Sequence, residues 1–312
     1  MKVRTICILG GTGFVGSHIS AKLASENYRI KILTRHPQRH RHLLVLPQLT
    51  LIKADIHNPT QLASQLKGCD AAINLVGILN ETGKNSFRRV HEELAVKVVN
   101  ACKQNNVQRL LHMSALNADA GGPSEYLRSK GKAENYVHTF SGQNLATTSF
   151  RPSVIFGPGD SFLNRFAGLL KQIPFFFPLA CPNALFQPVY VGDVADAFIK
   201  ALTDETNIGR HINLCGPQTY TLKQLVEFTA KTIDVRRKII GLPDWASRLQ
   251  ARLMGVLPGK PFTMDNYNSM KADSVCKQGK NCSTSLEMIA PKYLGKSGHE
   301  ALIQKLRETT RS

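Results

Sequence analysis

The chain has no run of apolar residues long enough to span a bilayer. Its amino terminus lacks a signal-peptide pattern, because the apolar run that begins at Ile6 passes directly into glycines. The seven cysteines are scattered, odd in number and free of any Cys-x-x-Cys pair, so their spacing predicts neither zinc nor another metal. We therefore expect reduced thiols and a cytoplasmic location for these 312 residues.

Acidic residues are scarce beside basic ones, with 22 Asp and Glu against 40 Lys and Arg and a net charge of +18. Such an excess favours anionic partners, such as nucleotide phosphates, an anionic membrane surface or an acidic protein. Helix-turn-helix and aromatic RNA-binding motifs are missing, which argues against nucleic acid as the partner. Hydrophobic residues make up 42% of the chain, enough for a sizeable buried core.

A glycine-rich turn lies near the amino terminus. The residues before it, Ile6–Leu9, are typical of a buried parallel strand. Glycines follow at Gly10, Gly13 and Gly16, and apolar residues at helical spacing begin at Phe14. A strand, a glycine turn and a helix in this order can hold a pyrophosphate on backbone N–H groups. The alternative is a turn that needs glycine only for its dihedral angles, but the context favours nucleotide binding.

No carboxylate occurs between Glu26 and Asp55. A dinucleotide-binding fold that prefers NAD places an acidic residue in this region, where it accepts from the ribose 2′-hydroxyl. Instead, arginines and histidines follow the second predicted strand, 30–33. A guanidinium group suits a 2′-phosphate, so the sequence predicts NADP(H) rather than NAD(H), with Arg35 as the first ligand and Arg39 as the second. The alternative is a solvated basic loop.

Two further predicted strands end in residues that a nucleotide could contact. Asp55 and Ile56 follow the third strand, where Asp55 can touch the adenine edge or simply cap a turn. Leu75, Val76 and Gly77 end the fourth strand, where small residues would let the cofactor pass.

Ser114, Tyr126 and Lys130 form a candidate catalytic group. Tyr126 and Lys130 are four residues apart and share one helical face. A neighbouring ammonium lowers the pKa of a phenol, which then can exchange a proton with a substrate oxygen during hydride transfer. Tyr267 and Lys271 have the same spacing, so spacing alone is not specific. Position favours the first pair, because Ser114 follows the fifth predicted strand at the end where parallel sheets bind ligands.

The sixth predicted strand, 146–150, ends at Arg151 and Pro152, and the proline is expected to stop the ladder of hydrogen bonds. Arg151 could bind a phosphate, bind a substrate acid or pair with a carboxylate, and these three alternatives stay open.

The remaining residues predict a smaller C-terminal α/β substrate lobe, with strands 211–214 and 236–240 flanking helix 222–233. We expect a first domain over 1–155 and a lobe over 156–312, with 188–203 returning to the first domain.

Two apolar stretches of the lobe have open roles. The aromatic residues of 174–178 form a loop that lines a pocket, touches lipid or covers core. In 242–257, Trp245, Leu249 and Leu253 share a helical face flanked by arginines. Such a helix can lie on an anionic membrane, but docking of that face onto the lobe is the commoner arrangement.

Seven segments, at 10–16, 54–55, 74–77, 114–119, 126–134, 151–158 and 187–195, carry a resemblance. In this order they resemble the extended short-chain dehydrogenases/reductases of the NAD(P)-dependent epimerase/dehydratase superfamily. The sequence is most similar to the atypical branch that holds the nucleotide-binding accessory subunit of respiratory complex I and its bacterial relatives. The resemblance implies a Rossmann-type, doubly wound parallel α/β sheet and the catalytic triad Ser114, Tyr126 and Lys130.

Two functions follow from the residues and the resemblance. The first is an NADP(H)-dependent oxidoreductase, or an epimerase- or dehydratase-like enzyme, acting on a small hydroxyl or carbonyl substrate. The second is a non-catalytic NADP(H)-binding accessory or assembly protein of a respiratory or quinone-related membrane complex, peripheral on the inner membrane. The predicted nucleotide contacts are Gly10, Gly11, Thr12, Gly13, Phe14, Val15, Gly16, Arg35, Arg39, Asp55, Ile56, Leu75, Val76, Gly77, Tyr126, Lys130, Arg151, Pro152 and Val154.

Overall fold

The structure is a computed structural model that describes residues 3–142, 144–277 and 280–295. The chain divides into two compact units. Unit 1 comprises Met1–Pro152 and Gly192–Leu214, and unit 2 comprises Ser153–Val191 and Cys215–Ser312. The sequence placed the boundary at 155 and the returning segment at 188–203, whereas the structure has the returning segment at 192–214.

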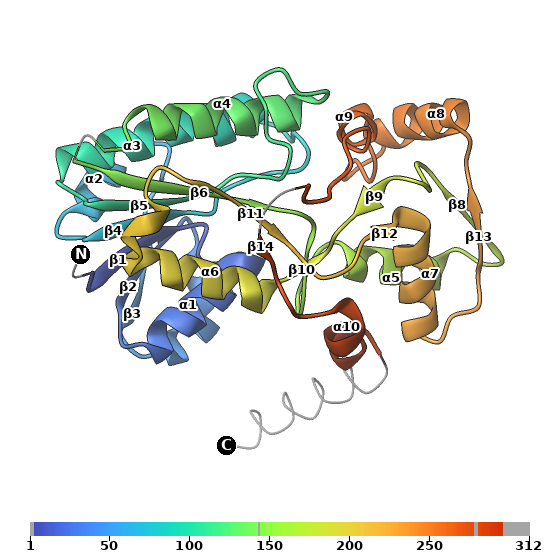
Figure 1. Cartoon of the computed structure of the whole chain (residues 1–312), viewed down its shortest axis with the longest axis horizontal. Helices are drawn as coiled ribbons and strands as arrows, with labels where there is room; N and C mark the ends of the chain where they lie inside the picture. The colour runs from blue at the N-terminus through green and yellow to red at the C-terminus, as the bar shows by residue number, and fades with distance from the viewer. Residues whose placement is uncertain (1–2, 143, 278–279, 296–312) are drawn as a thin grey trace. The chain divides into compact units, whose positions relative to one another are not determined.

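Unit 1 is built on a sheet of parallel strands (Figure 1). Its strands are β1 (Thr5–Leu9), β2 (Arg29–Thr34), β3 (Leu49–Lys53), β4 (Ala71–Asn74), β5 (Arg109–Met113), β6 (Ala146–Pro152) and β11 (His211–Cys215). They lie in the order β11-β6-β5-β4-β1-β2-β3. The chain order reverses between β1 and β4, which is the point at which such sheets bind ligands. The doubly wound parallel sheet expected from the sequence is confirmed.

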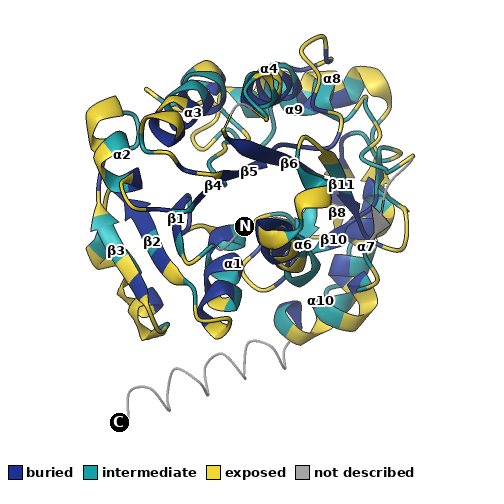
Figure 2. Cartoon of the chain, turned by 60° about the vertical axis from the view of Figure 1, so that its left-hand side comes forward, coloured by how far each residue is buried: buried dark blue, intermediate teal, exposed yellow. Residues whose placement is uncertain are grey.

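Helices cover both faces of this sheet. They are α1 (Phe14–Ser25), α2 (Pro59–Leu66), α3 (Leu94–Gln104), α4 (Glu125–Thr139) and α6 (Val191–Thr203), with shorter turns η1 (Pro37–Val45), η2 (Arg88–Glu93) and η3 (Glu205–Asn207). α2, α3 and α4 lie on one face, and α1 and α6 lie on the other (Figure 1). Leu62, Val98, Leu110 and Val137 join α2, α3, β5 and α4 in one buried cluster. Figure 2 shows the resulting pattern, with buried strands and exposed outer helix surfaces.

Side-chain caps explain where two of these helices begin. The Asn58 side chain accepts a hydrogen bond from the Gln61 N–H, and Pro59 occupies the first turn of α2. The Ser124 hydroxyl accepts from the Leu127 N–H and so starts α4. In this way the cap fixes the register of the helix that carries Tyr126.

One sequence expectation about the sheet of unit 1 was wrong. Strand 211–214 belongs to the main sheet rather than to the lobe, since β11 pairs in parallel with β6 and sets Ile212 beside Phe150. The expected end of the sixth strand at Pro152 is confirmed, because Pro152 is the last residue of β6 and its pairing with Leu214 is the last of the β6–β11 ladder.

Unit 2 combines short strands with five helices in its described residues. The strands are β7 (Ile155–Phe156), β8 (Phe176–Leu179), β9 (Leu185–Phe186), β10 (Val189–Tyr190), β12 (Tyr220–Thr221), β13 (Lys238–Gly241) and β14 (Lys280–Asn281). The helices are α5 (Leu163–Gln172), α7 (Leu222–Thr232), α8 (Asp244–Gly255), α9 (Met264–Ser269) and α10 (Leu286–Leu294). Leu170, Phe177, Leu225 and Ala290 belong to its buried core. Over the described residues, no helix of either unit has the length and apolarity of a membrane-spanning segment.

A disulfide between Cys215 and Cys276 closes a loop within unit 2. The segment around Cys276 is also held by hydrogen bonds, since the Cys276 N–H donates to Gln187 Oε1 at 3.0 Å and the Ser274 N–H donates to the Leu185 carbonyl at 2.8 Å. The expectation of reduced thiols was therefore wrong for this pair. The two cysteines are 61 residues apart, so no local motif announces their contact.

Candidate nucleotide-binding and active site

The glycine turn between β1 and α1 is packed so tightly that side chains are excluded at two positions. Gly10 has a φ of +79°, and a Cβ there would lie 3.2 Å from backbone atoms of Leu75 and Val76. A Cβ on Gly16 would lie 2.3 Å from the Gly10 carbonyl oxygen. The turn, the first helix and the segment after β4 therefore meet backbone to backbone.

The amino terminus of α1 has the features of an anion-binding site. Gly13 is its N-cap, in an extended conformation and without a side-chain cap, and no acidic residue lies in the first turn. A Cβ on Gly13 would meet only the Gly10 carbonyl oxygen, at 3.3 Å. The helix thus presents N–H groups and the positive end of its dipole at an open position. The residues predicted to hold the pyrophosphate, 10–16, are all gathered at this turn.

A second part of the predicted site is a cleft of about 500 Å³ beside the ends of β2 and β3. Arg35 and Asp55 both line it, together with Lys53. The Asp55 carboxylate accepts a hydrogen bond from the His57 N–H at 2.9 Å. Asp55 therefore also caps a turn, which was the alternative role predicted for it from the sequence. Arg39 lies in η1 and is not among the residues that line the cleft. Lys53, which the sequence reading missed, is the register partner of Thr34 on β2 and adds a second cation beside Arg35.

Lys130 links the candidate catalytic residues to the nucleotide segment. It is only 4% exposed, and its Nζ donates to the Met113 carbonyl at the end of β5 over 3.0 Å. A Cβ on Gly77 would lie 3.0 Å from the same Nζ, so α4, β5 and the segment after β4 converge here. Burial lowers the pKa of Lys130 to about 8, and the nearby Glu134 opposes this shift.

Ser114 occupies the next position after β5. Its N–H donates to the Phe150 carbonyl at 2.8 Å, which fixes the backbone. Its Oγ is buried and has no hydrogen-bond partner among the described residues. Buried hydroxyls are normally paired, so this atom is available to a ligand.

His112 lies two residues before Ser114 on the same face of β5. Asn74 orients it, because the Asn74 Oδ1 accepts from the Val76 N–H and the Nδ2 is left to donate to His112 Nδ1 at 3.3 Å. This assigns the ring proton to Nε2, which is buried and without a partner in the described part of the chain. Burial, with Lys130 and His138 nearby, lowers the pKa of His112 to about 3, so the ring is neutral.

His91 is a residue of this site that the sequence reading missed. The Ile78 N–H donates to its Nε2 at 3.1 Å, and its Nδ1–H donates to Ser129 Oγ at 2.8 Å. Ser129 Oγ in turn donates to the Tyr126 carbonyl at 2.9 Å. Burial and the Lys130 charge lower the pKa of His91 to about 2, so the ring stays neutral.

The His91 contacts join the segment after Gly77 to the first turn of α4, and the His91 ring lies 5.8 Å from the Tyr126 ring. A π-helical turn, η2, positions His91 for this role. Such a turn breaks the period of 3.6 residues, so helical periodicity gave no signal for it.

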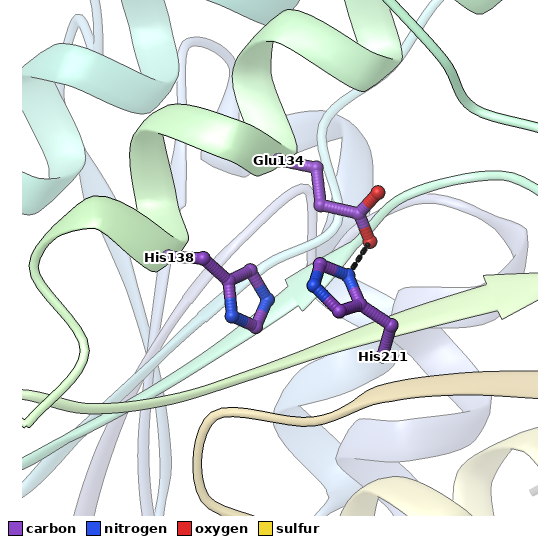
Figure 3. A group of neighbouring side chains, drawn as sticks. All are labelled: Glu134, His138 and His211. Atoms are coloured by element: carbon purple, nitrogen blue, oxygen red, sulfur yellow. Dashed lines mark hydrogen bonds and ion pairs between the residues drawn. The ribbon is translucent and has the colours of Figure 1, made fainter.

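Arg151 is held by a carboxylate, one of the three alternatives left open by the sequence. Its Nη2 and Nε donate to Glu134 Oε2 at 2.7 and 2.9 Å, and the Glu134 side chain is fully buried. His211 Nδ1 donates to Glu134 Oε1 at 2.9 Å, and the His138 ring stacks on His211 at 3.9 Å (Figure 3). The potential ligand atoms of Glu134, His138 and His211 lie close enough together to hold a metal ion. However, the Arg151 guanidinium already neutralises the carboxylate and would repel a cation, so we assign no metal here.

The last two predicted contacts follow Arg151. The Pro152 carbonyl accepts from the Leu116 N–H at 3.0 Å and so ties the end of β6 to the loop after β5. Val154 belongs to unit 2, where its carbonyl accepts from the Val189 N–H at 2.9 Å.

Comparison with known proteins finds relatives of two kinds. The mitochondrial NADH-ubiquinone oxidoreductase 40 kDa subunit of Neurospora crassa is 29% identical over 245 residues, which are 77% of this chain and 63% of that protein. The mitochondrial NADH dehydrogenase (ubiquinone) 1 alpha subcomplex subunit 9 of Arabidopsis thaliana is 26% identical over 303 residues, covering 92% of this chain and 75% of that one. Ceramide reductase of Caulobacter vibrioides is 24% identical over 246 residues, covering 77% and 74%.

Solved structures share the fold. Pal from Bacillus thuringiensis superposes with a TM-score of 0.69 at 18% identity, covering 96% of this chain and 99% of that one. The Thermus thermophilus UDP-glucose 4-epimerase, solved as a complex with NAD, gives a TM-score of 0.62 at 19% identity, covering 84% and 98%. The family described as the NAD dependent epimerase/dehydratase family matches residues 6–215, two thirds of the sequence, and the chain belongs to that family.

Proposed function

We propose that unit 1 binds a nicotinamide dinucleotide along the carboxyl ends of its strands. The observation that carries this proposal is the open amino terminus of α1, which follows a turn that admits only glycine at Gly10 and Gly16. Ser114 Oγ, which has no partner in the described part of the chain, and the buried Lys130 at the end of β5 fit the far end of such a ligand. The neighbouring fold solved with NAD and the relatives named as NADH dehydrogenase subunits support the same ligand class.

Within this class we propose NADP(H) as the preferred form. Arg35 and Lys53 line the same cleft, against the single carboxylate of Asp55, whose Oδ1 is already occupied by the His57 N–H. A charge-assisted hydrogen bond to the 2′-phosphate contributes about 1.5–3 kcal/mol, a factor of about 10 to 150 in affinity.

Calorimetric titration of the purified chain with NADPH and NADH tests both proposals. We expect saturable binding of both, tighter for NADPH, and an Arg35→Asp variant that loses most of the NADPH preference. Arg41→Asp makes the same charge change at an exposed residue that does not line the cleft, and should keep the preference. No saturation with either nucleotide refutes nucleotide binding, and equal affinities in the unmodified protein refute only the preference.

The chemistry we propose is proton transfer coupled to hydride transfer on a hydroxyl or carbonyl substrate. The nicotinamide would accept or supply the hydride. Tyr126 would exchange the proton with the substrate oxygen, Lys130 would stabilise the phenolate, and Ser114 Oγ would hydrogen-bond the same oxygen. The relatives named as a ceramide reductase and as a 3-beta-hydroxysteroid dehydrogenase support an oxidoreductase of this kind.

The second candidate is a protein that holds the nucleotide without turnover, as part of a respiratory complex. The relatives named as NADH dehydrogenase subunits favour it. Tyr126→Phe separates the two, because it removes the proton-transferring hydroxyl and leaves the ring that packs against Phe87 and His91. Cells that depend on this protein should lose its function with the variant if the protein is an enzyme. If the Tyr126→Phe variant fully restores the function in these cells, the enzymatic function is excluded and the nucleotide-holding function remains.

A further inference from the structure

The large apolar side chains of α8 face away from unit 2. Trp245, Leu249 and Leu253 are 70%, 49% and 60% exposed. The buried residues of this helix are the small ones, Ser247 and Ala251. Docking of the apolar face onto the lobe, which the sequence reading favoured, was therefore wrong, and the structure has the opposite face of the helix packed.

Contacts on that opposite face hold α8 in this orientation. The Cys181 N–H donates to Ser247 Oγ at 3.1 Å, and Gln250 Nε2 donates to the Pro178 carbonyl at 3.3 Å. Trp245, Leu249 and Leu253 lie at successive intervals of four residues and so form one stripe along the free side. The exposure of this stripe is thus set by the packing of the helix.

Further apolar side chains are exposed on neighbouring segments of unit 2. Val256 and Leu257, directly after α8, are 84% and 49% exposed. On the paired strands β8 and β13, Phe176 and Ile240 are also exposed. Phe175 is exposed with a φ of +59°, a conformation that bulky residues rarely adopt. Contact between so many large apolar side chains and water is unfavourable, and clusters of this kind mark interaction sites.

The charged residues of the segment that carries the stripe are almost all basic. Residues 236–260 include six Lys and Arg and a single acidic residue, Asp244. Asp244 is engaged, since it pairs with Arg248 and accepts from the Tyr267 hydroxyl. Arg252 lies beside Leu253 and is exposed. The basic segment and its exposed arginine therefore complement an anionic surface.

We infer that α8 lies on an anionic lipid bilayer, parallel to its plane. Trp245, Leu249 and Leu253 would enter the boundary between headgroups and acyl chains, while the exposed Arg252 extends to the headgroups. With 12 residues the helix is about 18 Å long, too short to span the hydrocarbon core. The inference concerns unit 2 alone and does not depend on nucleotide binding.

The chain offers a direct reporter, because Trp245 is its single tryptophan. We propose to record the tryptophan emission of the full chain with vesicles of phosphatidylcholine mixed with phosphatidylglycerol, and with vesicles of phosphatidylcholine alone. The anionic vesicles should shift the emission to shorter wavelength and sediment the protein, and added salt should weaken both effects. Emission that stays unchanged with the anionic vesicles overturns the inference.

Variants then test which residues insert. Leu249→Ser and Leu253→Ser keep the reporter and should each weaken vesicle binding by about tenfold, the factor expected for one apolar side chain that no longer inserts. Met288→Ser on α10 is the matched control, since Met288 is 59% exposed, and should bind normally. Equal loss in all three variants overturns the inference.

The charges are tested in the same way. Arg252→Gln should weaken binding to the anionic vesicles, and the exposed Lys292 on α10 provides the control Lys292→Gln. Equal binding to both kinds of vesicle, unaffected by Arg252→Gln, overturns the anionic part of the inference. A protein that ignores vesicles but binds another protein through the Leu249 face overturns the lipid part.

Discussion

Replacing His91 by phenylalanine tests whether its two hydrogen bonds connect the segment after β4 to α4. Phenylalanine keeps a planar ring of similar size between Phe87 and Tyr126 but removes both ring nitrogens. The Ile78 N–H then loses its acceptor, and Ser129 Oγ loses a donor. His91 itself is only 3% exposed, and its hydrogen bond with the Ile78 N–H is partly buried, so water replaces the lost contacts only in part.

The expected loss follows from the cost of leaving a buried polar group without a partner, about 1–3 kcal/mol. The Ile78 N–H is the main loss, because Ser129 Oγ still donates to the Tyr126 carbonyl. We therefore expect His91→Phe to lower the free energy of unfolding by about 2 kcal/mol near neutral pH.

This loss should depend on pH. The pKa of His91 in the folded chain is about 2, and an unfolded histidine has a pKa of about 6.5. The unfolded state therefore binds a proton that the folded state does not, so His91 costs the unmodified protein stability as the pH falls below about 6.5. The variant lacks this cost, which grows by about 1.4 kcal/mol per pH unit and reaches about 2 kcal/mol at about pH 5. The difference between the two proteins should shrink to about zero there.

Urea unfolding at about pH 7.5 and about pH 5 measures both values. Ser129→Ala is the matched control, because it breaks the same chain of hydrogen bonds without removing a titrating group. Its loss of stability should be the same at both pH values. A His91→Phe variant that is as stable as the unmodified protein at the higher pH, or equally destabilised at both, contradicts the hydrogen-bond assignment.

Three further predictions concern other parts of the chain. Cys276→Ser should lower the free energy of unfolding of unit 2 by about 4 kcal/mol without reductant, since the disulfide closes a separation of 61 residues; a urea midpoint unchanged from the oxidised protein would refute it. Glu134→Gln should cost about 3 kcal/mol, because it leaves the Arg151 guanidinium without its charge partner; thermal unfolding measures this, and an unshifted midpoint counts against the ion pair. Gly16→Ala should abolish nucleotide binding, whereas Gly168→Ala, whose new Cβ would have no described group from outside its own helical turn within 4 Å, should bind normally in the same titration.

The sequence predicted the sheet of unit 1 and the placement of its glycine turn because both depend on local patterns. Short apolar runs, each followed by a helical period, fix parallel strands in order, and the glycines at 10–16 mark the turn between two of them. The position of Lys130 at the end of β5 was predictable for the same reason, because the strand and the following helix both have clear sequence patterns.

Features that depend on distant contacts were not predictable in this way. β11 carries no signal that assigns it to β6 rather than to the lobe, and only its pairing with residues 60 or so positions earlier decides this. The Cys215–Cys276 disulfide and the Glu134–Arg151 ion pair also join separate elements. For α8 the amphipathic pattern was correctly read, but a pattern gives the faces of a helix and not which of them packs.

The choice between an enzyme and a nucleotide-holding protein depends on what each requires at the end of β5. A protein that only holds the nucleotide needs the glycine turn and cations to bind the phosphates. Neither of these two features requires a buried hydroxyl without a partner. Ser114 Oγ, however, is buried without a partner among the residues that the structure describes, at a cost of about 1–3 kcal/mol. Lys130 is buried beside the same strand end, where its pKa of about 8 keeps it protonated near neutral pH. The Ser114 hydroxyl and the Lys130 ammonium can both donate to the oxygen atom of a reacting hydroxyl or carbonyl. For this reason we favour the enzymatic function.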